Sequence, residues 1–167
     1  MRFRIEQQVA APLPAVEEAF VDPDFLKHLA DLPKLGGPDM LSREDDGTVV
    51  HLRLRYRFTG ELNAAVRAVL DPARLTWVED STVDRRTHRT SFRILPDHYG
   101  DRLTCTGTIW LEPEGDLATV RWAEGELSVR KVLLVGRAVE NAIVSGMADH
   151  ARLEAGLVQE WITGRSG

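Results

Sequence analysis

The stretch that decides the fold is VLLVGRAVENAIVSGMADHARLEAGLVQEWI, at residues 132–162. On a helical wheel, its apolar side chains gather on one face and its charged side chains on the other. Such a helix would be roughly 46 Å long, whereas a compact chain of this size has a diameter of about 40 Å. We therefore expect one helix to cross the whole molecule. Its apolar face comprises Val132, Val135, Val139, Ile143, Gly146, Met147, Leu153, Leu157 and Trp161.

Two polar residues lie on the apolar face of this predicted helix. His150 is near its middle, and Glu154 follows one turn later. Because an unpartnered carboxylate is costly to bury, either this face meets something polar or the two side chains satisfy each other as an i,i+4 pair. Gly164 is typical of a helix end, so we expect the helix to stop there.

The residues before this helix alternate between apolar and polar side chains, which indicates β-strands. The strand at residues 2–9 has Gln7 as the single polar residue on its apolar face, and the strand at residues 50–58 is the clearest in the chain. In the strand at 120–129, Val120, Trp122 and Glu124 align, but the apolar parity shifts after Gly125, which predicts a bulge. Further strands are predicted at residues 40–44, 75–83, 88–94 and 103–111.

Short helices and loops are predicted between these strands. Pro14 and the Asp22-Pro23 pair delimit a first helix, and a second follows near residues 25–29. A loop is expected at residues 33–38 and a further short helix at residues 62–70.

The order of these elements predicts an α+β fold. Consecutive hairpins make an antiparallel sheet, and the apolar face of that sheet needs a cover. We expect a curved antiparallel sheet of about seven strands wrapped around the long C-terminal helix, with two short helices after the first strand. The length suits a single domain over residues 1–167. Because the short side chains near Gly146 cannot fill all the space, a cavity is expected between sheet and helix.

The composition narrows the class of protein. With 43% hydrophobic and 28% charged residues, the chain is typical of globular proteins. Its net charge of -5 argues against a nucleic-acid partner. No apolar run is long enough to span a membrane, and the start does not read as a signal peptide. Since the single cysteine excludes an internal disulfide, we expect a cytoplasmic protein. The composition leaves its oligomeric state open.

Familiar catalytic and cofactor motifs do not occur in the sequence. We find no H-E-x-x-H, no nucleotide-binding glycine loop and no G-x-S-x-G elbow. The histidines are dispersed along the chain. We therefore expect neither a metal site nor a cofactor.

Two stretches resemble the START/Bet v 1-like (SRPBCC) superfamily, the helix-grip proteins that include polyketide cyclase/dehydratase-like members. The segment AAPLPAVEEAFVDPDF, which ends at Phe25, is similar to the opening of these proteins, and residues 125–140 resemble the strand-to-helix junction of an uncharacterised branch. The resemblance implies an internal apolar cavity for a lipid, a polyketide or another hydrophobic small molecule. Some relatives only bind and others catalyse, and no catalytic residue can be carried over.

The residues expected to line this cavity lie on the apolar faces of the strands and the long helix. Glu79 and Glu124 share the parity of those faces, so each either points inward or is turned outward by a shift of register. The predicted lining comprises Tyr56, Trp77, Glu79, His88, Phe92, Cys105, Ile109, Trp122, Ile143, Met147, His150 and Glu154.

Three functions are compatible with this arrangement. The leading hypothesis is binding of a hydrophobic small molecule without catalysis. The alternative is a cyclase/dehydratase-like enzyme that uses His150, Glu154 and Tyr56 for proton transfer. A third is a protein-interaction module with a filled core, which would present the arginine stripe of residues 53, 55 and 57 to an anionic partner. For that stripe, a solvated face paired with acids is the simpler interpretation.

Overall fold

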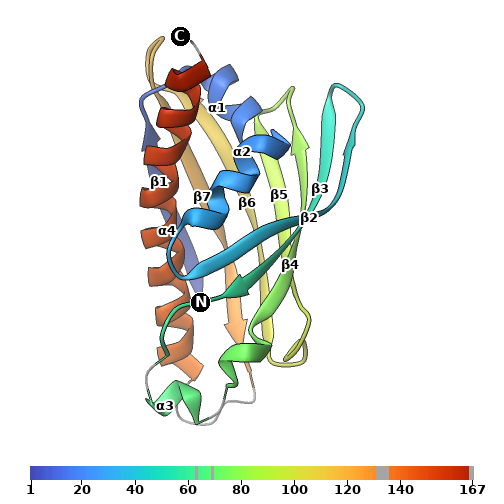
Figure 1. Ribbon diagram of the computed structural model, residues 1–167, viewed down its shortest axis with the longest axis vertical. Coiled ribbons are helices and arrows are strands. Elements are labelled where there is room, and N and C mark those ends of the chain that lie inside the picture. The colour runs from blue at the N-terminus through green and yellow to red at the C-terminus, as the bar shows by residue number, and fades with distance from the viewer. Residues whose placement is uncertain (63, 69, 131–135, 166–167) are drawn as a thin grey trace.

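The structure, a computed structural model, describes residues 1–62, 64–68, 70–130 and 136–165. Within these residues, seven strands form an antiparallel sheet in the order β1-β7-β6-β5-β4-β3-β2 (Figure 1). The strands are β1 (Arg2–Val9), β2 (Leu35–Asp45), β3 (Val49–Phe58), β4 (Thr76–Asp84), β5 (Arg89–Pro96), β6 (Leu103–Pro113) and β7 (Thr119–Val129). The α-helices are α1 (Leu13–Ala19), α2 (Pro23–His28), α3 (Ala64–Arg67) and α4 (Gly136–Arg165), with 3-10 turns at Leu29–Asp31 and Pro72–Arg74.

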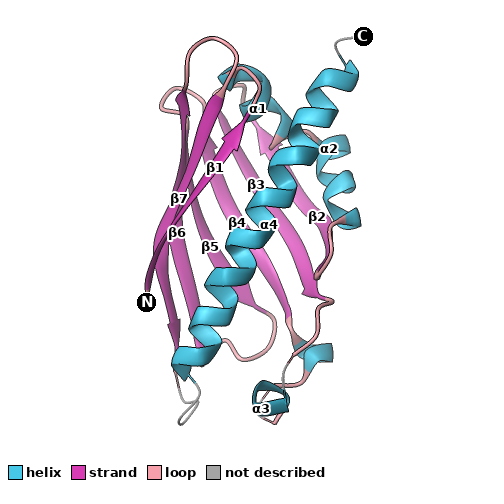
Figure 2. Cartoon of the chain, turned by 90° about the vertical axis from the view of Figure 1, so that its left-hand side faces the viewer, coloured by secondary structure: helices cyan, strands magenta, loops and turns pink. Residues whose placement is uncertain are grey.

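The long helix α4 crosses the concave face of the curved sheet diagonally, as Figure 2 shows. It packs most closely on β1 and β7 and on α1. Helices α1 and α2 cover one end of the same face, and α3 lies at the other end (Figure 2). The expected α+β architecture, with a curved sheet around the C-terminal helix and two short helices after the first strand, is confirmed.

The buried face of α4 is rotated from the predicted one. Val139, Ala151, Glu154 and Val158 are buried, whereas 46% of Leu153, which we placed on the apolar face, is exposed. The helix also continues past Gly164 to Arg165, so the predicted stop was wrong. Residues 132–135, where we expected the helix to begin, lie outside the described residues.

The strand β7 corrects a second prediction. Its pairing with β1 and β6 runs without a register shift, so it has no bulge after Gly125. In this continuous register Arg121, Ala123 and Gly125 lie opposite the inward residues of β1, and Trp122 and Glu124 point outward. The outward tryptophan is held there because its indole N–H donates to Glu112 at 3.0 Å.

Two other elements differ in length from the prediction. The strand β2 begins at Leu35, within the predicted loop, and has register shifts against β3 on both sides of Asp39 and Met40. The helix expected at residues 62–70 is described only as α3, at Ala64–Arg67. Both lie away from the centre of the sheet.

The core consists of two apolar clusters. The larger lies beneath α1 and α2 and includes Phe25, Leu29 and Val50, while the smaller gathers around Phe3 and Phe92. Small residues on the inner face of β6 and β7 make room for the smaller cluster. A Cβ at Gly125 would lie 2.6 Å from Phe3 Cζ, so only glycine fits there.

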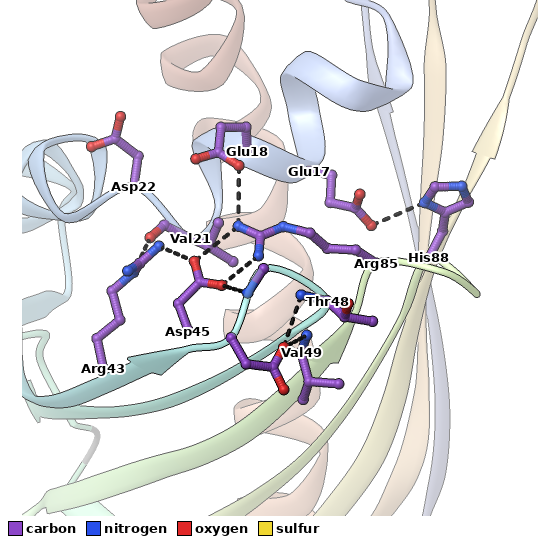
Figure 3. A network of polar contacts seen from close by, with 12 residues as sticks. Glu17, Glu18, Val21, Asp22, Arg43, Asp45, Thr48, Val49, Arg85 and His88 are labelled. Carbon is purple, nitrogen blue, oxygen red and sulfur yellow. Dashed lines mark hydrogen bonds and ion pairs between the residues drawn. The ribbon is translucent and has the colours of Figure 1, made fainter.

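A network of polar contacts fixes α1 to the turns beneath it (Figure 3). The Arg85 guanidinium donates to Asp45 at 2.7 Å and to Glu18 of α1 at 3.2 Å. Arg43 donates to the same aspartate at 2.6 Å and to the Val21 carbonyl at 3.0 Å. The Arg85 hydrogen bond and the charges of both arginines hold the pKa of Asp45 well below its usual range. The network closes one end of the space between sheet and α4.

Candidate functional site

Polar side chains from five elements converge in the interior, between the sheet and α4. We call Gln7, Tyr56, Glu79, Arg121 and Glu154 the interior polar cluster. They come from β1, β3, β4, β7 and α4, respectively. The last four influence one another electrostatically, since Arg121 and Glu154 affect the pKa values of both Tyr56 and Glu79. Residues far apart in the sequence therefore form one site.

Three members of this cluster bind one another directly. Gln7 lies opposite Arg121 in the β1–β7 pairing, and Arg121 Nη1 donates to Gln7 Oε1 at 2.9 Å and to Glu154 Oε2 at 3.3 Å. Gln7 Nε2 donates to the Ala151 carbonyl at 2.6 Å. The guanidinium also lies over the ring of Phe20, 4.2 Å from its centroid. The buried carboxylate of Glu154 is thus compensated by a cation and an amide.

Glu79 lies in a different environment. In the register of the sheet it lies opposite Leu54 on β3 and Ile94 on β5, and it shares its face of β4 with Trp77. It makes no hydrogen bond or ion pair with any residue that the structure describes. Burial raises its pKa to about 7, the charge of Glu154 adds to this effect, and Arg121 opposes it. Glu79 is therefore an interior carboxyl without a partner.

Tyr56 lines the same part of the interior. Its ring stacks on Trp77 with 5.9 Å between the centroids and 16° between the planes. Only 9% of Tyr56 is exposed, and the described residues offer its hydroxyl no hydrogen-bond partner. Burial, together with the charges of Glu79 and Glu154, raises its pKa well above its usual range. The hydroxyl therefore remains a neutral donor.

His150 does not form the i,i+4 pair with Glu154 that the sequence suggested as one possibility. Glu154 is engaged by Arg121 and Gln7. The Nδ1 atom of His150 is buried and has no hydrogen-bond partner among the described residues. A buried nitrogen without a hydrogen-bond partner is destabilising, and no described residue offsets this cost.

The interior is filled unevenly. Beneath α1 and α2, inward-facing side chains such as Val16, Val21 and Val50 are fully buried. Elsewhere in the interior, several inward-facing side chains, Glu79 among them, keep part of their surface accessible. These half-buried residues are Trp77, Glu79, Ile94 and Ile109 on the strands, and Ile143 and Met147 on α4. We call these six residues the loosely covered part of the interior; Glu79 belongs to it, although its neighbours Leu54 and Tyr56 are buried.

Most of the predicted lining residues face this interior. Phe92 and Cys105 are buried in the smaller apolar cluster, against which Ile109, Ile143 and Met147 pack. Burial raises the pKa of the Cys105 thiol to about 11, with a further contribution from the charge of Glu79. The thiol is therefore protonated at neutral pH.

Two predicted lining residues lie elsewhere. Trp122 is on the outer face of the sheet, where it stacks on Trp110 with 6.2 Å between the centroids. His88 lies in the turn between β4 and β5, and its Nδ1 is 3.0 Å from Glu17 of α1 (Figure 3). The predicted inward direction of Trp122 was wrong because the outer face of β7 also buries aromatic surface. Glu124 is outward too, paired with Arg4 at 2.8 Å.

The parity error also concealed the only cation of the interior polar cluster. The alignment of Val120, Trp122 and Glu124 on one face gave no reason to expect Arg121 in the interior. The signal that could have found it was the plain alternation of Thr119, Arg121, Ala123 and Gly125, continued without a bulge.

The outward arginines of the sheet are largely paired with acids. Arg55 lies 2.9 Å from Asp97, and Arg93 lies 2.8 Å from Asp80. These pairs agree with the simpler interpretation of the sequence, in which the arginines lie on a solvated face of the sheet and are neutralised by acids.

In the described part of the chain, no group of three His, Cys, Asp or Glu side chains is arranged to hold a metal ion. No described helix is both long and apolar enough to cross a membrane.

Two hollows, of about 430 and 230 Å³, lie along the C-terminal part of α4, and the smaller is lined by His28, Leu157, Glu160 and Trp161.

A curved antiparallel sheet wrapped around a long C-terminal helix is the helix-grip fold, the fold that the START/Bet v 1-like resemblance implied. The chain belongs to the family described as "Protein of unknown function (DUF2505)", which matches residues 4–162. A search of curated proteins found no match.

Solved structures support the assignment of the fold. A START superfamily protein of Mycobacterium smegmatis is 14% identical, with 98% of this chain and 97% of that chain covered and a TM-score of 0.56. Norcoclaurine synthase of Thalictrum flavum is 22% identical, with 96% and 87% covered and a TM-score of 0.60. The Zhui aromatase/cyclase of a Streptomyces species is 19% identical, with 98% and 86% covered and a TM-score of 0.55. At these identities the similarity establishes the fold alone.

Proposed function

We propose that the protein binds a hydrophobic small molecule between its sheet and α4. The observation that carries this proposal is the set of unpartnered polar groups in the interior. Glu79, the Tyr56 hydroxyl and His150 Nδ1 have no hydrogen-bond partner among the described residues. Of these three, His150 Nδ1 is fully buried, and a buried polar atom without a partner is destabilising. A bound molecule that supplies hydrogen bonds would remove that cost.

The surroundings of these groups support an apolar body for the ligand. Ile94, Ile109, Ile143 and Met147 face the same interior and are only half-buried. A ligand packed against them would remove further apolar surface from water, at about 25 cal/mol for each Å². Pockets with apolar walls and a few polar groups are typical of small-molecule sites.

A direct test is native mass spectrometry of freshly purified protein, followed by organic extraction. We expect an additional mass that extracts as a small apolar molecule. Protein that shows no such mass and also fails to bind 1-decanol in solution would contradict the proposal.

His150 provides a residue-level test of the same proposal. His150→Ala should weaken binding of the extracted molecule severalfold. It should change the free energy of unfolding by less than about 1 kcal/mol, because it removes an unsatisfied nitrogen. The matched control is His51→Ala, since His51 is exposed on β3 and bonds Thr82. Unchanged binding in His150→Ala would exclude this role for His150.

A second candidate function is an enzyme of the cyclase or dehydratase kind, favoured by one observation. The pKa of Glu79, about 7, suits a general acid or base at neutral pH. Glu79 is better placed for this role than Glu154, which is occupied by Arg121. A synthase and a cyclase share the fold. If the extracted molecule is converted by the wild type and not by Glu79→Gln, the protein is an enzyme; if both leave it unchanged, this candidate fails.

A further inference from the structure

We propose that the bound molecule carries a protonated amine and that Glu79, beside the stacked rings of Tyr56 and Trp77, is the residue that holds it. This inference rests on the proposed function, because it names the chemistry of the ligand's polar end. Three features support an amine: the charges of the interior polar cluster, the aromatic rings around Glu79, and the hydrogen bonds that already engage Arg121.

The charges of the cluster are unequal in number. Glu154 is paired with Arg121, whose Nη1 lies 3.3 Å from Glu154 Oε2. No cation forms an ion pair with Glu79 among the described residues. An ionised Glu79 therefore leaves this interior with one negative charge in excess. A ligand with a single positive charge would balance it.

The walls around Glu79 also suit a cation. Trp77 lies two residues before Glu79 on the same face of β4 and stacks on Tyr56 across the β3–β4 pair. Phe92 is a diagonal neighbour, since its partner Ser81 lies two residues after Glu79. Aromatic faces attract ammonium groups, with most effect where water is excluded. Carboxylate and rings together are therefore selective for an amine on an apolar body.

An anionic ligand fits this interior less well. The cation that it would need, Arg121, already donates Nη1 to Gln7 and Glu154. The ring of Phe20 covers a face of the same guanidinium. A carboxylate or phosphate would have to displace Glu154 and leave a buried charge without compensation, which is costly.

The experiment compares three probes with the same chain: n-decylamine, 1-decanol and decanoate, each below its micellar concentration. Binding is measured by calorimetry at about pH 8, where both the amine and Glu79 are charged, and in moderate salt to screen the net negative charge of the protein. We expect decylamine to bind at least about tenfold more tightly than decanol, and decanoate to bind most weakly. Glu79→Gln should abolish the preference for the amine and retain binding of decanol.

Two control variants separate this site from general effects. Glu124→Gln removes an outward carboxylate from the same sheet and should keep the preference for the amine. Trp77→Leu should reduce amine binding more than decanol binding, and it tests the inference independently should Glu79→Gln fail to fold.

The outcomes distinguish the two proposals. Equal binding of amine and alcohol by the wild type, or a preference for decanoate, would overturn the amine inference and leave the proposed function standing. A preference that survives in Glu79→Gln would assign the amine to another site and overturn the role of Glu79. If none of the three probes binds although an apolar molecule is extracted from the protein, the amine inference fails and the proposed function stands. If none binds and no such molecule is extracted, both fail.

Discussion

Arg121 of β7 and Glu154 of α4 face each other inside the protein, with 3.3 Å between Nη1 and Oε2. The pair joins the long helix to the sheet that it covers, and Gln7 bonds both partners. Because both side chains are largely buried, each charge depends on the other for compensation. The pair therefore contributes to the position of α4 as well as to the electrostatics of the interior.

The first prediction concerns this pair. Glu154→Leu and Arg121→Leu should each lower the free energy of unfolding by about 3 kcal/mol, because each leaves a buried charge uncompensated. The double variant should lose less than the sum of the two single losses, as measured by urea unfolding. On the exposed face of the same helix, Arg152→Leu breaks the pair with Asp149 and should cost less than about 1 kcal/mol. Strictly additive losses would show that the two charges do not compensate each other.

The second prediction concerns pH. The pKa of Glu79 is raised from 4.5 to about 7, so the folded state holds this proton more tightly than the unfolded state does. The stability contributed by the neutral carboxyl is complete below about pH 4.5 and is lost as pH rises through 7. The charges of Arg121 and Glu154 affect the pKa of Glu79. The charge of Glu79 in turn raises the pKa values of Tyr56 and Cys105.

Glu79→Gln tests this linkage, because the amide does not titrate. The variant should be more stable than the wild type at about pH 8, by up to about 3 kcal/mol, and the difference should shrink toward pH 5. Thermal or urea unfolding across this range measures it. A constant difference between variant and wild type at all pH values would contradict the raised pKa.

The third prediction uses two glycines. Gly125→Ala should lower the free energy of unfolding by about 1–3 kcal/mol, because the new Cβ would collide with the Thr106 backbone carbonyl oxygen and lie 2.6 Å from Phe3 Cζ. Adding Phe3→Leu should recover only a small part of that loss, since the Thr106 carbonyl remains. By contrast, a Cβ at Gly146 on α4 meets nothing within 4 Å, so Gly146→Ala should stabilise the protein by up to about 1 kcal/mol. A neutral Gly125→Ala would mean that the backbone of Thr106 and the ring of Phe3 both move aside without cost, which would contradict the prediction.

The fourth prediction concerns the network in Figure 3. Arg85→Gln should lower the melting temperature slightly and speed amide exchange in α1, since Arg85 joins Asp45 to Glu18. The pKa of Asp45 is depressed, so this contribution is present at neutral pH and is lost as the carboxylate is protonated in acid. The difference between variant and wild type should therefore vanish at low pH. Arg86→Gln, at an exposed arginine one residue away, should leave α1 unaffected.

The sequence by itself determined the architecture. Alternation with a period of two identified the strands, and the period of 3.6 identified the helix that covers them. These patterns arise because each element must bury one face, and seven strands followed by one long amphipathic helix allow few arrangements. Parity and helical phase alone placed Tyr56, Phe92 and Met147 in the interior, where the structure has them, whereas they left the direction of Glu79 open.

Only the tertiary structure decided which polar groups meet there. On β7 both faces bury apolar surface, so alternation could not tell which of Arg121 and Trp122 points inward. The partners of Glu154 are Gln7 of β1 and Arg121 of β7, the first and last strands along the chain. Nothing in the local sequence predicts such a contact. The phase of α4 was also set by the sheet, which buries Val158 and leaves Leu153 exposed. Local periodicity specifies faces, whereas pairing across the sheet and packing against it specify neighbours.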